Sequence, residues 1–164
     1  MLDLEGGTYL LSSPVVLPAG GNMRVSDGSL RAAGTFPRDR WLLESNQDCL
    51  WKCTPGVDCR YWNTSTLCHE DITVENVYFD SSHVASGGLL LNNSMGCVIS
   101  RSYFLGFWRS GVNIQGGHEI LIEQCWLGET WWDEPPPENQ SSIGILVSTH
   151  SLDSCFRMDV LDNG

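Results

Sequence analysis

The chain has 164 residues with 20 acidic and nine basic side chains, which gives a formal net charge of −11. This charge excludes nucleic acid as a partner, because nucleic-acid binding requires a basic surface. It also argues against an anionic membrane surface, since the sequence has no basic amphipathic segment and no apolar run of transmembrane length. The length fits one domain with enough chain to bury a core.

The first residues have the pattern of short strands separated by turns. In LDLEGGTYLLSSPVVLP, residues 2–18, apolar runs flank a Gly-Gly pair and a Ser-Ser-Pro segment, and both of these favour turns. A strand solenoid needs caps that cover its stacked core. Because the strand pattern starts at residue 2 and a new coil begins near the other end, we expect these 164 residues to lack one or both caps.

A cysteine-rich segment, residues 46–70, interrupts the strand pattern and is predicted to be an insertion loop. Its cysteines have the spacing C-x3-C-x5-C-x8-C, which does not match the paired C-x2-C knuckles of structural zinc sites. We therefore expect no metal, and two disulfides that hold a surface loop, with three connectivities open. The four residues are Cys49, Cys53, Cys59 and Cys68.

Two rows of similar segments alternate along the chain. The first row is ITVENVYF, CVISRSYF and ILIEQCWL, beginning at residues 72, 97 and 120, with apolar or small residues at places one, three, six and eight. The second row is GLLL, GVNI and GILV, beginning at residues 88, 111 and 144. The longer last step contains a Pro-rich insertion loop, residues 129–143. Interleaved rows with a common period indicate a structural repeat.

The period suits one coil of a parallel β-helix, because it holds two or three short strands and their turns. It is too short for a propeller blade and lacks the Leu-x-x-Leu-x-Leu pattern of leucine-rich repeats. The sequence therefore predicts an all-β solenoid of about four to five coils. Stacked coils place equivalent inward side chains in columns. The predicted columns are Ile72/Cys97/Ile120, Val74/Ile99/Ile122 and Phe79/Phe104/Leu127, with Gly88, Gly111 and Gly144 in register on another sheet.

The GGHE segment lies between a second-row strand and the next first-row strand. Gly116 and Gly117 permit positive φ, so the segment is predicted to be a sharp turn. His118 beside Glu119 is a candidate for a pH-sensitive or sugar-contacting pair. The alternative is an exposed turn histidine without a role.

Several features predict a secreted glycoprotein. Three Asn-x-Ser/Thr sequons lie in segments predicted to be turns or insertions, and they accompany the cysteine-rich loop. Neither a basic n-region nor an apolar h-region precedes the first strands, so we expect a fragment of a longer secreted chain. Cys97 and Cys125 take inward places as small apolar residues. The sequon residues are Asn63, Asn92 and Asn139.

Three segments carry a resemblance to a known family. GGTYLLSSPVVLP, SLRAAGTFPRDRWLLES and SGVNIQGGHEILIEQCWLGE resemble segments of the pectate lyase superfamily, and within it the quartet-type plant polygalacturonases. The resemblance extends over residues 2–147 apart from the cysteine-rich insertion. It implies a right-handed parallel β-helix and a secreted, cofactor-free enzyme that acts on galacturonan in cell walls.

The resemblance does not supply catalytic residues. Polygalacturonases of the large glycoside hydrolase family carry Asp residues in NTD-G-x-D and DD motifs, and their inverting mechanism needs an acid and a base on opposite sides of the glycosidic bond. The segment of this chain most similar to the NTD-G-x-D motif is WRSGVN, in which Ser110 and Asn113 occupy the two Asp positions around the glycine. Neither side chain can protonate a leaving group, so we expect the catalytic carboxylates to lie outside this chain.

Aromatic and charged residues near the second row are candidates for substrate binding. Aromatic rings stack on sugar faces, and an arginine binds a uronate carboxylate through two hydrogen bonds. The alternative is a solvated, proline-stiffened lip, with the first tryptophan packed under a loop. The candidates are Trp108, Arg109, His118, Trp131, Trp132, Asp133 and Glu134.

The sequence favours part of a hydrolase directed at polygalacturonan, secreted to the cell wall, with a polysaccharide as its partner. One alternative is a non-catalytic carbohydrate-binding or adhesive β-helix. Another is a pectate-lyase-type enzyme that uses Ca²⁺ and a basic residue for β-elimination. Clustered Asp residues on one strand row would favour the lyase, and Ser110 and Asn113 do not provide them.

Overall fold

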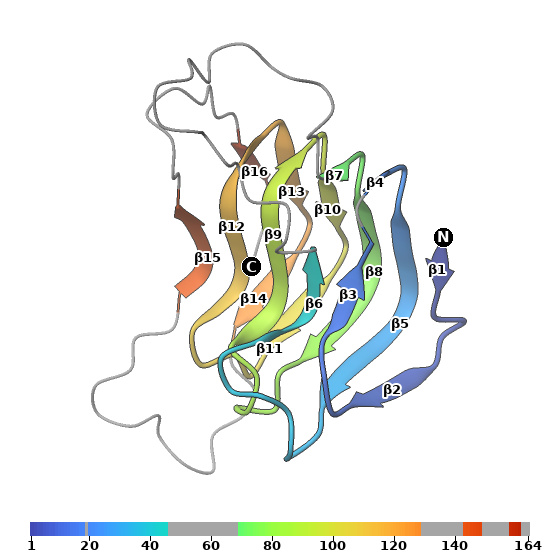
Figure 1. The fold of residues 1–164 in the computed structure, drawn as a ribbon, viewed down its shortest axis with the longest axis vertical. Coiled ribbons are helices and arrows are strands. Elements are labelled where there is room, and N and C mark those ends of the chain that lie inside the picture. The colour runs from blue at the N-terminus through green and yellow to red at the C-terminus, as the bar shows by residue number, and fades with distance from the viewer. Residues whose placement is uncertain (19, 46–68, 129–142, 149–157, 162–164) are drawn as a thin grey trace.

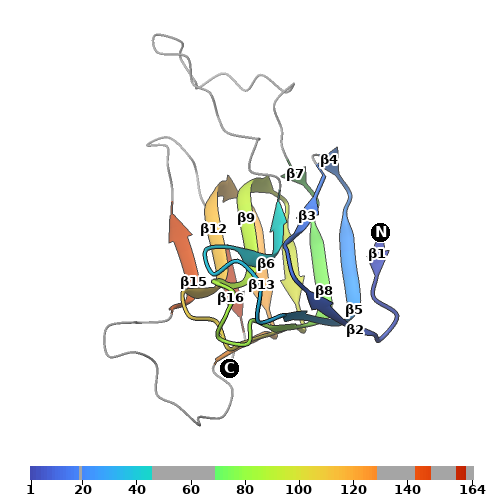
Figure 2. The same cartoon turned by 60° about the horizontal axis from the view of Figure 1, so that its bottom comes forward.

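The computed structural model describes residues 1–18, 20–45, 69–128, 143–148 and 158–161. Within these ranges every regular element is a β-strand and every strand pair is parallel. The strands form two sheets that face each other across one core (Figures 1 and 2). The predicted parallel β-helix is confirmed. The described residues contain no helix long and apolar enough to cross a membrane.

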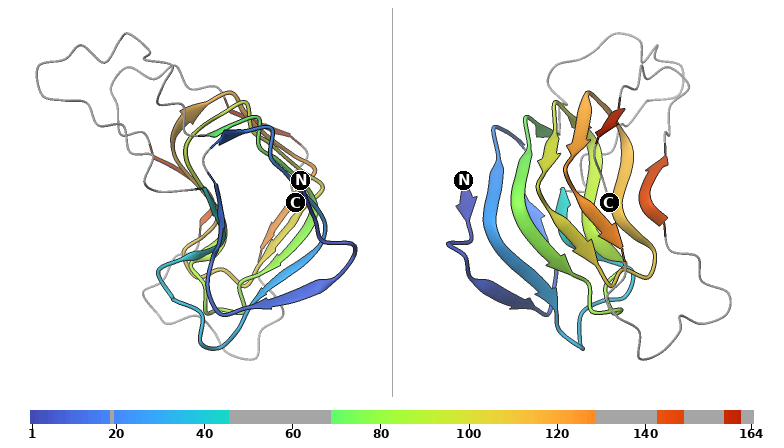
Figure 3. Two further views of the ribbon diagram at one scale, coloured as in Figure 1. Left: turned by 45° about the vertical axis from the view of Figure 1, so that its right-hand side comes forward. Right: turned by 180° about the vertical axis from the view of Figure 1, so that it is seen from behind.

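Sheet A contains the first-row segments of the repeat. Its longest strands, β5 and β8, pair with each other. The first half of β8 then pairs with β10 of the next coil and its second half with β11. Sheet A therefore bends between its two halves and forms two walls of the solenoid (Figure 3). Its strands are β1 (Leu2–Asp3), β2 (Thr8–Leu11), β5 (Arg24–Ala32), β8 (Thr73–Asp80), β10 (Val98–Ser100), β11 (Tyr103–Leu105), β13 (Ile120–Glu123), β14 (Trp126–Gly128) and β16 (Met158–Leu161).

Sheet B contains the second-row segments and forms the remaining wall. The chain passes from sheet A to sheet B and back once in each coil, so neighbouring strands of a sheet come from successive coils. This connection is what makes every pair parallel. Its strands are β3 (Val15–Leu17), β4 (Gly20–Gly21), β6 (Trp41–Ser45), β7 (His69–Glu70), β9 (Gly87–Met95), β12 (Ser110–His118) and β15 (Ile143–Ser148).

The predicted inward columns are confirmed by the strand register. Val74 pairs with Ile99 and Ile99 with Ile122, while Phe79 pairs with Phe104 and Phe104 with Leu127. The rings of Phe79 and Phe104 stack with centroids 4.7 Å apart and an angle of 6° between their planes. That distance matches the strand spacing within a sheet. The core therefore consists of stacked columns of equivalent side chains, with one side chain from each coil. Gly88, Gly111 and Gly144 also lie in register with one another, as predicted.

Two corners of each coil are turned by single residues with left-handed backbone conformation. The stacking of coils places these residues in register, so each corner is a column. Glu119 of the GGHE segment lies in the first column at φ 57°, and Gly116 and Gly117 precede it at φ 77° and 100°. The predicted positive φ values are therefore present, but the turn is shorter than predicted, because Gly116, Gly117 and His118 belong to β12 and only Glu119 lies between the strands. The corner residues are Asn22, Asp71, Gly96 and Glu119 in the first column and Asp27, Asn76, Arg101 and Gln124 in the second.

Some sequence-based boundaries and placements need correction. β7 pairs with β4 and β9, so the last two residues of the predicted insertion 46–70 belong to sheet B, as does Ile143 at the end of the insertion 129–143. Asn92 was predicted to lie in a turn, but it lies within β9 and is only 5% exposed. Ladder pairing with Gln115 of β12 holds it there. The inward placement of Cys97 and Cys125 is confirmed, since both thiols are buried.

Candidate functional site

The outer surface of sheet B carries side chains that do not belong to the core. Leu43, Leu89 and Val112 share one register position and belong to the core cluster. The next residue along each strand must point to the opposite face. This position is occupied by Glu44, Leu90 and Asn113. The alternation is interrupted at the start of these strands, because Leu42, Gly88 and Gly111 also face the core. Trp41 and Ser110, which precede Leu42 and Gly111, therefore join the outer positions, and the five residues form what we call the sheet B face.

The sheet B face is buried although it points away from the core cluster. Its five residues are between 0% and 4% exposed. Three of its polar atoms, Nε1 of Trp41, Oγ of Ser110 and Oδ1 of Asn113, have no hydrogen-bond partner among the described residues. A buried polar group without a partner costs about 1–3 kcal/mol. Native structures contain few such groups, and each of them calls for a partner such as water, an ion or a ligand.

Glu44 differs from these three groups because its carboxylate has hydrogen-bond partners, and these partners lie at the start of its own strand. Its carboxylate accepts two parallel hydrogen bonds from Arg40, with Nε–Oε1 at 2.9 Å and Nη2–Oε2 at 2.5 Å. It also accepts the backbone N–H of Trp41 at 2.8 Å. These hydrogen bonds raise the pKa of the Arg40 guanidinium. A carboxylate held in this way fixes the start of β6 and is not available as a general acid.

A close approach of backbone to side chain brings Trp41 and Ser110 together. Gly87 pairs with Trp41 in the ladder. A Cβ at Gly87 would overlap the carbonyl oxygen of Ser110 and lie 2.8 Å from Nε1 of Trp41. Only glycine fits at this position, and its lack of a side chain lets the Ser110 carbonyl and the Trp41 indole lie close to β9.

Trp108 and Arg109, both sequence candidates, lie at the entrance to β12 beside this face. Nε1 of Trp108 donates to the carbonyl oxygen of Arg38 at 2.9 Å, and this oxygen also accepts the hydroxyl of Ser86 at 2.7 Å. Arg109 is exposed, and its guanidinium carbon lies 5.8 Å from the centroid of the Trp41 ring. This distance is within the range of a cation–π contact. Trp108 therefore ties two loops together, while Arg109 lies exposed beside the Trp41 ring.

The remaining sequence candidates are not brought to this face by the described structure. His118 ends β12, where its backbone pairs with that of Met95, on the far end of the strand from Ser110. Other candidates and modification sites lie outside the described residues, and their roles stay predictions. These are Trp131, Trp132, Asp133, Glu134, Cys49, Cys53, Cys59, Cys68, Asn63 and Asn139.

Sequence reasoning missed Trp41 and Glu44. Both lie in RDRWLLES, a stretch within one of the family-like segments, but WLLES lacks the glycine that marked the other strands of this row. The ladder pairs Trp41 with Gly87 and Leu43 with Leu89, which makes β6 an earlier member of the same row. An alignment that allowed Leu42 in the place of glycine would have found it.

Three polar groups of the face have hydrogen-bonding capacity that is not used among the described residues, although the face is buried. The hydroxyl of Ser110 and the amide of Asn113 offer donors and acceptors, and the Trp41 indole offers a donor. Within the described residues, no three His, Cys, Asp or Glu side chains come together as metal ligands. The chemistry of this donor set suits the hydroxyl groups of a carbohydrate.

A comparison with curated proteins finds similarity to the protein named Polygalacturonase QRT3 of Arabidopsis thaliana, which is 30% identical over 131 residues. The match includes 78% of this chain and 24% of that protein, so the chain spans about a quarter of the length of this relative. No family model matches the chain, and no solved structure matches it either. Together with the parallel β-helix, the partial match supports a distant relationship to the polygalacturonases.

Proposed function

We propose that this chain is a polysaccharide-binding part of a secreted, polygalacturonan-directed glycoside hydrolase, and that it does not carry a complete pair of catalytic carboxylates. Arg109, which is exposed at the edge of this face, pairs with a uronate carboxylate. Ser110, Asn113 and Trp41 are buried here, so in this proposal they bind the polysaccharide only when the residues that cover them are displaced. The observation that carries the proposal is the group of three buried, unpartnered polar atoms on the sheet B face. The partial match to a polygalacturonase indicates which class of ligand they take.

The proposal excludes turnover by this chain alone for a chemical reason. Inverting hydrolysis requires a protonated acid and a base about 6.5–9.5 Å apart on either side of the bond. On the sheet B face, Glu44 is the single carboxylate among the described residues, and Arg40 and the Trp41 N–H hold it as an acceptor. Ser110 and Asn113 cannot replace the second acid.

The experiment measures binding and turnover on the same purified 164-residue chain. Retardation in gels containing polygalacturonate reports binding, and an assay for new reducing ends reports turnover. We expect binding without turnover, and we expect Ser110→Ala/Asn113→Ala to weaken the binding about tenfold, because each replacement removes a hydrogen bond to the ligand. Thr8→Ala, at an exposed threonine of β2 in sheet A, is the matched control.

Two outcomes would overturn the proposal. Turnover that disappears in Asp133→Asn/Glu134→Gln would make the Pro-rich insertion an active site. Binding that is equal in the double variant and the control would remove the sheet B face from the site. A β-helix that is purely adhesive is the second candidate, favoured by Ser110 and Asn113 in the places of Asp. It predicts binding without turnover even when the chain is extended to the full gene product.

A further inference from the structure

The outer surface of sheet A carries a row of exposed aromatic side chains. Tyr78, Tyr103 and Trp126 pair in register on β8, β11 and β14, so they come from three successive coils. Their neighbours Phe79, Phe104 and Leu127 point into the core, which directs the aromatic rings outward. They are 39%, 50% and 51% exposed. We call these three residues the aromatic row.

The rings in this row are splayed, unlike the pair beneath them. The centroids of Tyr78 and Tyr103 are 6.0 Å apart with an angle of 29° between the rings, whereas Phe79 and Phe104 stack at 4.7 Å and 6°. The two tyrosine rings are stacked less closely than the phenylalanine rings, and both tyrosines remain partly exposed. Partly open rings on successive coils form a continuous surface along the solenoid axis.

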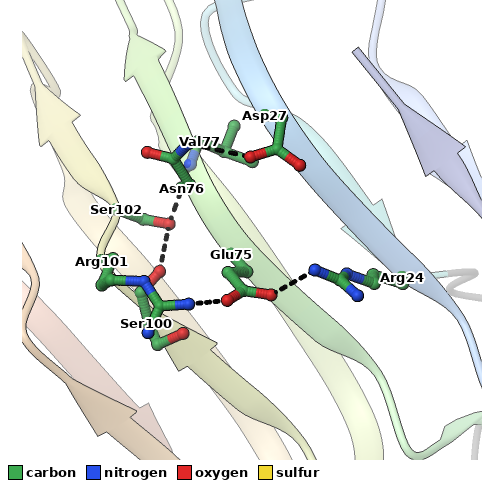
Figure 4. A network of polar contacts seen from close by, with 8 residues as sticks. All are labelled: Arg24, Asp27, Glu75, Asn76, Val77, Ser100, Arg101 and Ser102. Atoms are coloured by element: carbon green, nitrogen blue, oxygen red, sulfur yellow. Dashed lines mark hydrogen bonds and ion pairs between the residues drawn. The ribbon is translucent and has the colours of Figure 1, made fainter. Parts of the chain in front are cut away.

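Ion pairs border the aromatic row, and in each pair the arginine is the exposed partner. Glu75 lies between Arg24, at 2.6 Å, and Arg101 (Figure 4). Arg31 contacts Asp80 through Nε at 3.1 Å. The arginine side chains are 48–57% exposed, while those of Glu75 and Asp80 are 20% and 19% exposed. A ligand on this surface therefore meets guanidinium groups first, on a chain whose overall charge is −11.

We propose that the aromatic row binds one extended strand of an acidic polysaccharide that runs along the solenoid axis. Successive coils are about 4.8 Å apart, a spacing comparable to that of successive sugar rings in an extended chain. Each sugar can then contact one ring, because aromatic side chains present large, rigid apolar faces. Arg31 and Arg101, on opposite sides of the row, pair with carboxylate groups of the sugars.

The charge of this surface argues against a second copy of the chain as its occupant. A two-fold contact through the aromatic row would place the same arginines of both copies near one another. Like charges brought together across an interface cost free energy. Three aromatic side chains also provide much less than the roughly 800 Å² per partner of a standard protein interface. A narrow acidic strand fits both the width and the charge.

This site is separate from the sheet B face, since it lies on the other sheet. The inference rests on the proposed function only for the choice of polygalacturonate as the probe. Retardation in gels containing polygalacturonate is compared with retardation in gels containing neutral hydroxyethyl cellulose. We expect Tyr103→Ala/Trp126→Ala to weaken binding to polygalacturonate about tenfold, because two ring contacts are lost. Tyr103→Phe/Trp126→Phe keeps the rings and is expected to bind as the unmodified chain does.

A second pair of variants tests the preference for acidic chains. Arg31→Gln is expected to reduce the retardation by polygalacturonate severalfold and to leave that by the neutral polymer unchanged, while Arg31→Lys keeps most of the effect. Denaturant unfolding of each variant reports whether the fold is intact. Equal retardation of the Ala and Phe double variants would overturn the proposal. So would a dimer in sedimentation that dissociates on Tyr103→Ala/Trp126→Ala, because a second copy would then be the occupant.

The sheet A and sheet B variants separate the two proposals. If only Ser110→Ala/Asn113→Ala weakens binding, the aromatic row has no role and the proposed function stands. If only the aromatic double variant weakens it, the chain binds acidic polysaccharide through sheet A and the sheet B face has no role. Additive losses in the combined variant would support two independent contacts.

Discussion

Gly87 has no room for a side chain, because the carbonyl oxygen of Ser110 and the indole of Trp41 occupy the space. The substitution Gly87→Ala is expected to lower the free energy of unfolding by about 2 kcal/mol, as overpacking does in other cores. Urea unfolding followed by fluorescence measures it. Gly34→Ala is the matched control, because a Cβ at Gly34 meets nothing within 4 Å. Equal stability of the two variants would contradict the geometry at Gly87.

The buried thiol of Cys97 is expected to make stability depend on pH in the alkaline range. Burial raises the pKa of Cys97 to about 11 from an ordinary value of 9.0. Between these values the folded chain holds a proton that the unfolded chain has lost, so stability falls as pH rises. The contribution is complete below pH 9 and is lost by pH 11, with a total of roughly 2–3 kcal/mol.

The free energy of unfolding of the unmodified chain and of the Cys97→Ala variant, measured at pH 8 and at pH 11, tests this pH dependence. The variant is expected to lose less stability over this range than the unmodified chain. Cys125, whose pKa is also raised by burial, is present in both proteins and cancels in the comparison. An identical loss in both would show that the Cys97 thiol does not titrate as its burial implies.

At the scale of the strand and its corner, residues of the second corner column have a left-handed backbone conformation, and two of them are joined by a side-chain hydrogen bond between neighbouring coils. Asn76 has φ 54°, and its amide donates to Oδ1 of Asp27 on the coil before at 2.9 Å. This hydrogen bond is the main reason why the pKa of Asp27 lies below its usual value. Asparagine suits the place because it tolerates positive φ better than most residues.

Substitution at this corner is expected to separate the backbone and side-chain contributions. Asn76→Ala loses the hydrogen bond and must hold a left-handed conformation, so we expect a loss of about 1–2 kcal/mol. Asn76→Gly loses only the hydrogen bond, and we expect it to be the more stable of the two variants. Thermal unfolding of both proteins gives the comparison. If the alanine variant were as stable as the glycine variant, the corner would carry no conformational strain.

The inward columns could be read from the sequence, but the corner columns could not. Ile72, Val74 and Phe79 recur as apolar residues in segments of equal length, and a period of two fixes which side chains face the core. The corners carry no common residue type, since Arg101 and Gln124 stand in line with Asp27 and Asn76. Their left-handed conformation is imposed by the stacked strands on either side and leaves no pattern in the sequence.

At the scale of the whole molecule, sequence reasoning found the fold and the neighbourhood of the site but not its composition. Trp108 and Arg109 do lie beside the sheet B face. Trp41 and Glu44 come from a strand more than 60 residues earlier in the chain, and only the register of β6 on β9 brings them there. Parallel pairing between distant segments depends on the path of the chain through the intervening coils, which local periodicity does not record.

The two one-residue corners determine where the length of the chain can change. Adding a residue there would shift the following strand by one place and turn its inward side chains outward. The connections from sheet A to sheet B carry no such restriction, and they differ in length from coil to coil, being residues 33–40, 81–86, 106–109 and 129–142. A foreign peptide or reporter tag grafted between Gly34 and Thr35, which are exposed, would therefore leave both sheets in register. The solenoid is in this sense a scaffold that accepts extra residues at the connections from sheet A to sheet B and at residues 46–68 between β6 and β7, but not at its two corners.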